Sequence, residues 1–216
     1  MSVKIHKETV TDLLWDQLKV LMQIQSLEPF RLVGGTALSL LIGHRISVDI
    51  DLFTDLEYGS VDFKKIYKEI KKEFRYVSTE KWVNKVMGNS CFIGVEKSET
   101  VKLDLFYCDD FVFPIIEFEN IRISSIEEIL AMKLDIIGRE TGGRKKDFWD
   151  IHALIGKYNL TEMLDIYERR YPFSHSRAEI KDGLTNFETA DHDPDPNCLL
   201  SKKWELIKLD LEELQE

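Results

Sequence analysis

The stretch that most constrains the fold of this chain is residues 33–53, which read VGGTALSLLIGHRISVDIDLF. A short apolar run ends there on two glycines, and residues 36–42 then have the composition of a short apolar helix. Residues 47–54 alternate between polar and apolar side chains, which predicts a strand. Because strand side chains point alternately to the two faces of a sheet, Asp49 and Asp51 are predicted to share one face.

The glycines and the two carboxylates favour related chemistry. Asp49 and Asp51 repel each other unless a positive charge lies between them, and Mg²⁺ prefers such carboxylate oxygens. Gly34 and Gly35 allow a sharp turn and the close approach of a ligand to the backbone. The helix that follows, with Thr36 as its predicted N-cap, directs free N–H groups toward a phosphate. Together these features indicate metal-assisted chemistry on a nucleotide; the alternative is a glycine turn beside a solvated strand face.

The spacing of these residues resembles a known signature. It consists of a hydrophobic residue, two glycines, thirteen intervening residues, and then Asp–hydrophobic–Asp–hydrophobic. This pattern resembles the nucleotidyltransferase superfamily related to DNA polymerase beta. The fuller pattern GGTAL…HR.S.DIDLF is similar to the abortive-infection nucleotidyltransferase toxins, the toxin half of type IV toxin–antitoxin pairs. The resemblance covers roughly residues 30–155, and no motif is recognised beyond about residue 160.

A third carboxylate lies further along the chain. Residues 101–106 read VKLDLF, with Asp104 between two leucines and Lys102 two residues earlier on the same strand face. On its own, an aspartate in a strand is usually an exposed residue. In the superfamily, however, a third carboxylate on a neighbouring strand completes the metal site, and Asp104 matches that position. The resemblance therefore implies Mg²⁺, with Mn²⁺ as a substitute, held by Asp49, Asp51 and Asp104.

The helical half of the chain supplies candidate contacts to the nucleotide. Residues 144–150 read RKKDFWD and resemble the family's R.KD..D motif. The resemblance implies that Lys133 contacts phosphate, while Asp147 and Asp150 orient the basic residues or the attacking group. From the residues alone, a charged and capped helix start explains this segment equally well. The predicted nucleotide-binding residues are Gly34, Gly35, Thr36, Ser47, Lys133, Arg144, Asp147 and Asp150, and the predicted catalytic and metal-binding residues are Asp49, Asp51 and Asp104.

The pattern along the whole chain predicts an α+β protein with the nucleotidyltransferase fold, in which a mixed β-sheet flanked by helices precedes an all-helical part. We expect two domains, 1–123 and 124–216. Serines and glutamates at residues 124–128 form two overlapping capping boxes, which predict the start of a helix there. Strands are predicted at 30–33, 47–54, 76–83, 91–97, 101–107 and 121–124, and helices at 9–27, 36–42, 60–74, 124–138, 145–157, 160–171, 174–187 and 199–215.

Composition limits the partners and the compartment. The net charge of −10 argues against a broad electrostatic grip on nucleic-acid backbone, so an RNA substrate requires a local basic patch or a partner's help. The three cysteines are widely spaced and form no C-x-x-C pair, which suits a reducing cytosol better than a disulfide framework or a zinc site. Because no segment reads as a signal peptide or a membrane span, we expect a cytoplasmic protein without membrane contact.

The sequence therefore predicts a metal-dependent enzyme that moves a nucleoside monophosphate from an NTP to an acceptor. The resemblance implies a bacterial or archaeal toxin with a separately encoded antitoxin, and tRNA or another RNA as acceptor. One alternative is a non-catalytic nucleotide-binding or interaction protein with the same fold, although the intact set of carboxylates speaks against it. Another is a metal nuclease built from the same acids, which explains the two glycines less well.

Overall fold

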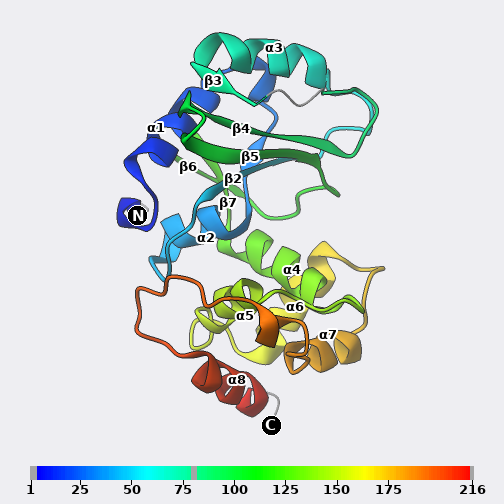
Figure 1. Ribbon diagram of the computed structural model, residues 1–216. Coiled ribbons are helices and arrows are strands. Elements are labelled where there is room, and N and C mark those ends of the chain that lie inside the picture. Colours follow the sequence, from blue (N-terminus) through cyan, green and yellow to red (C-terminus); the bar gives the residue numbers. More distant parts are fainter. Residues whose placement is uncertain (1–3, 79–81, 215–216) are drawn as a thin grey trace.

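The computed structural model describes residues 4–78 and 82–214, and a mixed β-sheet lies at its centre (Figure 1). The seven strands of this described sheet run in the order β3-β4-β5-β2-β1-β7-β6. β2 pairs with β5 and β1 with β7 in parallel, and the remaining pairs are antiparallel. The strands are β1 (Arg31–Leu32), β2 (Asp49–Thr54), β3 (Tyr76–Val77), β4 (Gly88–Glu96), β5 (Glu99–Tyr107), β6 (Ile115–Phe118) and β7 (Ile121–Ser124).

Alternation along the strands decides which face of the sheet is buried. In β2, Ile50 and Leu52 are fully buried, and Leu103 and Leu105 are their partners in β5. Helices α1 (Asp12–Leu21) and α3 (Phe63–Glu73) lie on one side of the sheet, whereas α2 (Gly34–Ile42) and the later helices lie on the other (Figure 1). The second side carries the half-buried residues of β2 and β5.

The chain after β7 is helical. Its helices are α4 (Ile126–Ile137), α5 (Lys145–His152), α6 (Leu160–Arg170), α7 (Arg177–Leu184) and α8 (Trp204–Glu213). Ser125 caps α4 by accepting a hydrogen bond from the Glu128 backbone N–H, so the second of the two predicted capping residues starts the helix. The buried core is continuous from the sheet into these helices. The α+β class and the mixed sheet flanked by helices are confirmed, and the division into two domains stays a prediction.

Several element boundaries differ from the sequence prediction. The predicted helix 9–27 is split into α1 and short 3₁₀ turns at Lys7–Thr9 and Gln25–Leu27. Strand β6 was not predicted; its four residues are too few to show alternation, and it forms a hairpin with β7. The turn between them is Glu119–Asn120, and both residues have positive φ, as a tight hairpin turn requires.

The ends of two predicted elements lie outside the described residues. The predicted strand 76–83 corresponds to the two residues of β3, and residues 79–81 are not described. The predicted helix 199–215 starts later, at Trp204 in α8, and residue 215 is not described.

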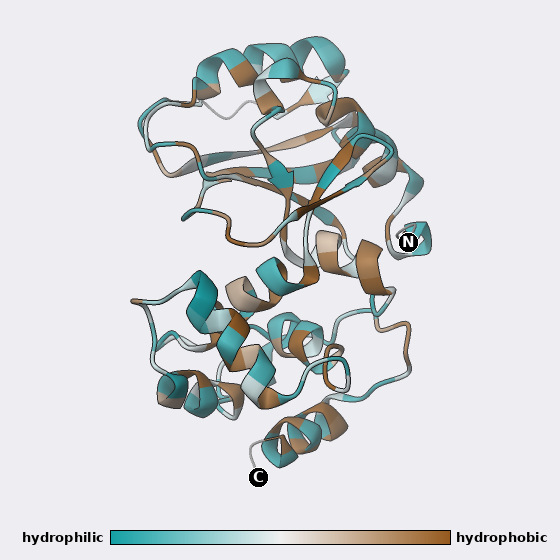
Figure 2. Ribbon diagram, turned by 180° about the vertical axis from the view of Figure 1, so that it is seen from behind, coloured by the Kyte–Doolittle hydropathy of each residue, from teal (hydrophilic) through white to brown (hydrophobic). Residues whose placement is uncertain are grey.

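The surface of α3 is polar, and its lysines face solvent (Figure 2). Phe63, Ile66 and Ile70 form its buried stripe. Across the described residues, no helix combines the length and the apolar character needed to span a membrane.

Candidate active site

The three predicted carboxylates lie on one face of two adjacent strands. In the parallel β2–β5 pair, Asp51 is the register partner of Asp104, and Asp49 is the partner of Lys102. All four side chains are half-buried, while their neighbours along each strand are buried in the core. We call Asp49, Asp51, Asp104 and Lys102 the acidic face.

Charge repulsion within the acidic face is strong. The pKa of Asp51 is raised to about 6, first because the carboxyl is buried and then because Asp104 and Asp49 repel its negative charge. Lys133 and Lys146 oppose this shift. A carboxylate with a raised pKa is stabilised by any cation that arrives beside it, so the acidic face favours a cationic ligand.

Asp104 is held by the neighbouring lysine. Lys102 Nζ lies 2.5 Å from Asp104 Oδ2. The other oxygen, Oδ1, is buried and has no hydrogen-bond partner among the described atoms. Within the described residues, no three His, Cys, Asp or Glu side chains are arranged to hold a metal ion. In this arrangement Asp104 is paired with Lys102, and metal binding by the three carboxylates stays a prediction.

At each of the two glycines, a Cβ would collide with a different neighbour. Gly34 has φ +68°, and a Cβ there would lie 2.6 Å from Asp51 Oδ2. A Cβ on Gly35 would lie 2.2 Å from a terminal nitrogen of Arg45. The N-terminus of α2 therefore packs directly against the acidic face at Gly34. At Gly35 the neighbour that a Cβ would meet is the Arg45 guanidinium, and contact of either glycine with a ligand stays a prediction.

Thr36 connects α2 to β2 instead of capping the helix. The helix begins at Gly34 and has Val33 as its N-cap, without a side-chain hydrogen bond. Thr36 is fully buried; its hydroxyl bonds to Ser47 Oγ at 2.8 Å and donates to the Asp49 carbonyl. The predicted N-cap role is therefore wrong, because the hydroxyl points back to the strand. These bonds fix the start of β2, and a phosphate contact of Thr36 or Ser47 stays a prediction.

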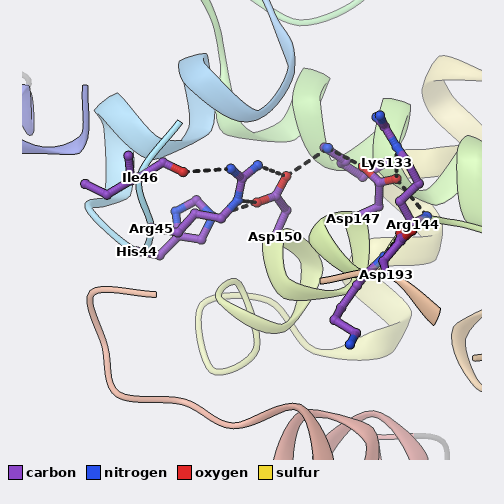
Figure 3. Close-up of polar contacts among 9 residues, drawn as sticks. His44, Arg45, Ile46, Lys133, Arg144, Asp147, Asp150 and Asp193 are labelled. Carbon is purple, nitrogen blue, oxygen red and sulfur yellow. Dashed lines mark hydrogen bonds and ion pairs between the residues drawn. The ribbon is translucent and has the colours of Figure 1, made fainter. Parts of the chain in front are cut away.

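A second cluster of charges lies behind the acidic face, between the loop after α2 and helices α4 and α5 (Figure 3). Asp150 Oδ1 accepts hydrogen bonds from His44 Nε2 at 2.7 Å and from Arg45 Nε at 2.6 Å. Asp150 Oδ2 is bonded by Arg45 Nη2 at 3.0 Å and lies 2.8 Å from Lys133 Nζ. Lys133 Nζ also donates to Asp147 Oδ1 at 2.5 Å. We call these five residues the buried network.

Charges in the buried network are balanced. Burial opposes the ionisation of Asp150, but Lys133 and Arg45 outweigh it and hold the pKa well below its usual value. Burial lowers the pKa of His44 despite the bond to Asp150, so this ring favours its neutral form. Two cations, Arg45 and Lys133, thus face two carboxylates, Asp147 and Asp150.

Lys133 belongs to this network, and its charge also reaches the acidic face. Its side chain is only 6% exposed, and both of its described ion pairs are with aspartates. Its positive charge also lowers the pKa of Asp51, which places it close behind that carboxylate. The sequence predicted a phosphate contact for Lys133, and the contacts observed here orient Asp147 and Asp150. Direct contact of these three residues with a nucleotide stays a prediction.

A hollow of about 470 Å³ opens beside Asp49. Asp49, Ser47, Arg144 and Lys146 line it, together with the loop at residues 193–197. Lys145 holds this loop in place: its backbone N–H donates to Asp193 and its Nζ donates to Asp195, both at 3.0 Å.

Lys146 was not predicted as a site residue. Its pKa is lowered first by burial and then by the nearby charge of Arg144, as expected for two cations that share one hollow. The only sequence signal for its role is its position next to Arg144 in the RKKD segment. The hollow therefore places two cations beside the first carboxylate of the acidic face.

Comparison with known proteins identifies the family. Residues 18–216 match the family model described as nucleotidyl transferase AbiEii toxin, type IV TA system. An uncharacterized protein of Aquifex aeolicus (strain VF5) is 28% identical over 150 residues, which is 66% of this chain and 66%, just under two thirds, of that protein.

One solved structure shows the same fold. A crystal structure of a protein from H. pylori, described as a nucleotidyltransferase, superposes with a TM-score of 0.59 at 21% identity, over 92% of this chain and 90% of that one. A nucleotidyltransferase-like antigenic protein from Paracoccidioides brasiliensis gives a TM-score of 0.48 at 18% identity, over 80% and 87%. With the family model matching nearly the whole chain, this protein belongs to the nucleotidyl transferase AbiEii toxin family of type IV toxin–antitoxin systems.

Proposed function

We propose that this nucleotidyltransferase moves a nucleoside monophosphate from an NTP to a hydroxyl of an RNA acceptor, tRNA included, on the acidic face. One observation carries the proposal: Asp51 and Asp104 are register partners on adjacent parallel strands, and the N-terminus of α2 packs against Asp51 through Gly34. Carboxylates beside a helix N-terminus combine a site for cations with N–H groups suited to phosphate.

The residues present fit a divalent metal ion. Asp49, Asp51 and Asp104 would hold Mg²⁺ or Mn²⁺, and the unpaired Oδ1 of Asp104 and the raised pKa of Asp51 support that assignment. A bound divalent cation would neutralise charge on the triphosphate and lower the pKa of the attacking hydroxyl. Lys102 Nζ bonds Asp104 Oδ2, so Oδ1 is the oxygen available to a metal ion, and Oδ2 would join it only after the lysine is displaced.

The side chains of this protein then bind and orient the substrates. Arg144 and Lys146 lie beside Asp49 and attract the β- and γ-phosphates. Asp104 accepts the proton of the acceptor hydroxyl while the hydroxyl oxygen forms a bond to the α-phosphorus. The bond from that phosphorus to the oxygen that bridges it to the β-phosphorus breaks, and pyrophosphate leaves. Such transfer depends mainly on positioning and charge stabilisation. The buried network fixes the start of β2 and α5 relative to each other.

Arg144 and Lys146 bring two cations to the hollow beside Asp49, but Asp193 and Asp195 line it as well, so this hollow is not by itself a basic surface. An acidic protein of charge −10 attracts a polyanion only through a local basic surface. An RNA acceptor therefore needs further basic residues or the help of a partner. Membership of a type IV family also supports a separately encoded antitoxin as partner. Reading the neighbouring genes and co-expressing the candidate antitoxin tests that part of the proposal by whether growth is restored.

Incubation with α-³²P-labelled NTPs, Mg²⁺ and total RNA tests the transfer itself. Label in RNA with the wild-type chain, and its loss in Asp51→Asn, is the expected result. Asp16→Asn, on the exposed surface of α1, serves as the matched control and should keep full transfer. Shortened RNA without label would indicate a nuclease, and NTP binding without any transfer would indicate a non-catalytic binding protein.

A further inference from the structure

A second hollow lies on the opposite side of the acidic face from Arg144 and Lys146. Its volume is about 410 Å³, within the range of small-molecule sites. Phe53 of β2 lines one wall, and Met132 and Ile136 of α4 line the other together with Arg139, which follows the end of α4. Tyr58, Tyr107 and Tyr171 line it as well, together with the carboxylates Asp109 and Asp135, and we call it the aromatic hollow.

Phe53 belongs to an aromatic pair in register with the catalytic carboxylates. Phe53 is the register partner of Phe106, and the ring centroids are 5.9 Å apart at an angle of 55°. Each phenylalanine follows its aspartate by two residues, Asp51 in β2 and Asp104 in β5. All four side chains therefore point to the same face, and the aromatic pair lies about 6.6 Å along the strands from the carboxylate pair.

The order of the features along β2 indicates the orientation of a bound nucleotide. Asp49 borders the hollow that holds Arg144 and Lys146, and Phe53 borders the aromatic hollow, with Asp51 between them. A nucleoside triphosphate has the same order: an anionic tail, the α-phosphorus, and then a flat base roughly one nucleoside away. Bases stack on aromatic side chains irrespective of their identity.

We propose that Phe53 and Phe106 form the seat for the base of the incoming nucleoside triphosphate, with its phosphates toward Arg144 and Lys146. This inference rests on the transfer proposed above and adds the orientation of the nucleotide. The base of the RNA acceptor is the competing occupant. Cations at the far end of the same strand favour the triphosphate, since they assign the anionic tail to the Asp49 side and the base to the Phe53 side.

Binding measurements with two probes test this orientation. Calorimetric titrations compare inorganic tripolyphosphate with each of ATP, GTP, CTP and UTP, in Mg²⁺ and without acceptor. Phe53→Leu and Phe106→Leu keep apolar bulk but lose the ring. Each should weaken NTP binding by at least about fivefold and leave tripolyphosphate binding unchanged. Arg144→Gln and Lys146→Gln should weaken binding of both probes.

The matched control is Phe92→Leu. Phe92 lies on the same face of the sheet as register partner of Lys102, and it is 45% exposed. Phe53 lines the aromatic hollow and Phe106 contacts the Phe53 ring, whereas among the described ring contacts none involves Phe92. Its substitution should leave both affinities unchanged. Circular dichroism of each variant verifies folding, and Phe53→Trp and Phe106→Trp, which restore a flat ring, should recover NTP affinity.

Three outcomes would overturn the inference. Unchanged NTP affinity in both leucine variants, with wild-type transfer intact, would remove the seat and leave the proposed function standing. A rise only in the KM for RNA would assign the aromatic pair to the acceptor. A wild-type chain that neither binds NTP nor transfers label would refute the proposed function itself, and the seat with it.

Discussion

Two clusters of aspartates lie close together in this protein, and they differ in charge balance. The acidic face has three carboxylates and one paired lysine, and the pKa of Asp51 is raised to about 6 by burial and by Asp104. The buried network has two carboxylates and two cations, and the pKa of Asp150 is held well below its usual value, although burial opposes this. The same residue type is thus structural in one cluster and available for a ligand in the other. The number of cations within reach makes the difference.

Breaking the buried network should have the largest effect. Asp150→Asn leaves Arg45 and Lys133 buried with Asp147 as their only carboxylate in the network, so the free energy of unfolding should fall by about 3–5 kcal/mol. Denaturant unfolding followed by circular dichroism measures the loss. Asp16→Asn, which removes an exposed pair with Lys19, should change little. Equal effects of the two substitutions would contradict the structural role of Asp150.

Asp51→Asn should raise the free energy of unfolding at neutral pH in EDTA, whereas Asp150→Asn lowers it. Because the folded-state pKa of Asp51 is about 6 and its ordinary value is 3.8, the folded chain keeps a proton that the unfolded chain loses between these values. Wild-type stability therefore falls as pH rises through this window and stays low above it. The variant avoids this loss.

The variant should consequently gain on the order of 3 kcal/mol well above pH 6 and nothing below about pH 4. Thermal unfolding from pH 4 to 8 without metal measures the difference. Groups acting on Asp51 besides Asp104 are Asp49, Lys133 and Lys146, and they are unchanged in the variant. A gain in stability that does not depend on pH would show that ionisation of Asp51 does not destabilise the folded protein.

Substitutions of the adjacent residues Gly34 and Gly35 should distinguish the acidic face from the buried network. Gly34→Ala should cost about 1–2 kcal/mol through its left-handed backbone, and should weaken stabilisation by Mg²⁺ because the new Cβ displaces Asp51. Gly35→Ala should cost about 1–3 kcal/mol by pushing on Arg45, and should leave the Mg²⁺ response intact. Thermal unfolding with and without Mg²⁺ distinguishes them. The same loss of Mg²⁺ response in both variants would contradict this division.

Removing the lysine of the acidic face should have the smallest effect on the stability of the fold. It should raise the affinity of the acidic face for Mg²⁺. Lys102→Met frees Asp104 Oδ2, so Mg²⁺ no longer competes with an ammonium group. We expect affinity for Mg²⁺ to rise on the order of fivefold, measured by the metal dependence of thermal unfolding. Lys97→Met, at the exposed turn between β4 and β5, is the control. Weaker Mg²⁺ binding in Lys102→Met would mean that the lysine helps to hold the site open.

The acidic face could be predicted from the sequence because strand alternation is a local rule. Once DID and KLD are assigned to strands, the side chains of Asp49, Asp51, Lys102 and Asp104 can only point in two directions. Burial of Asp150 could not be predicted in this way. It depends on Arg45, which lies 105 residues earlier in the sequence. The role of Lys146 could not be predicted either, because the hollow that it lines is completed by residues 193–197, which lie beyond any recognised motif.

The long separation between Arg45 and Asp150 has a consequence for the synthesis of the protein on the ribosome. A nascent chain that has not yet reached residue 144 carries all three aspartates of the acidic face but lacks Lys146 and the carboxylates that hold Arg45 and Lys133. An incomplete chain should therefore bind no NTP, which filter binding on arrested ribosomes would measure. In a toxin, this order of assembly would delay activity until the last third of this sequence is being translated.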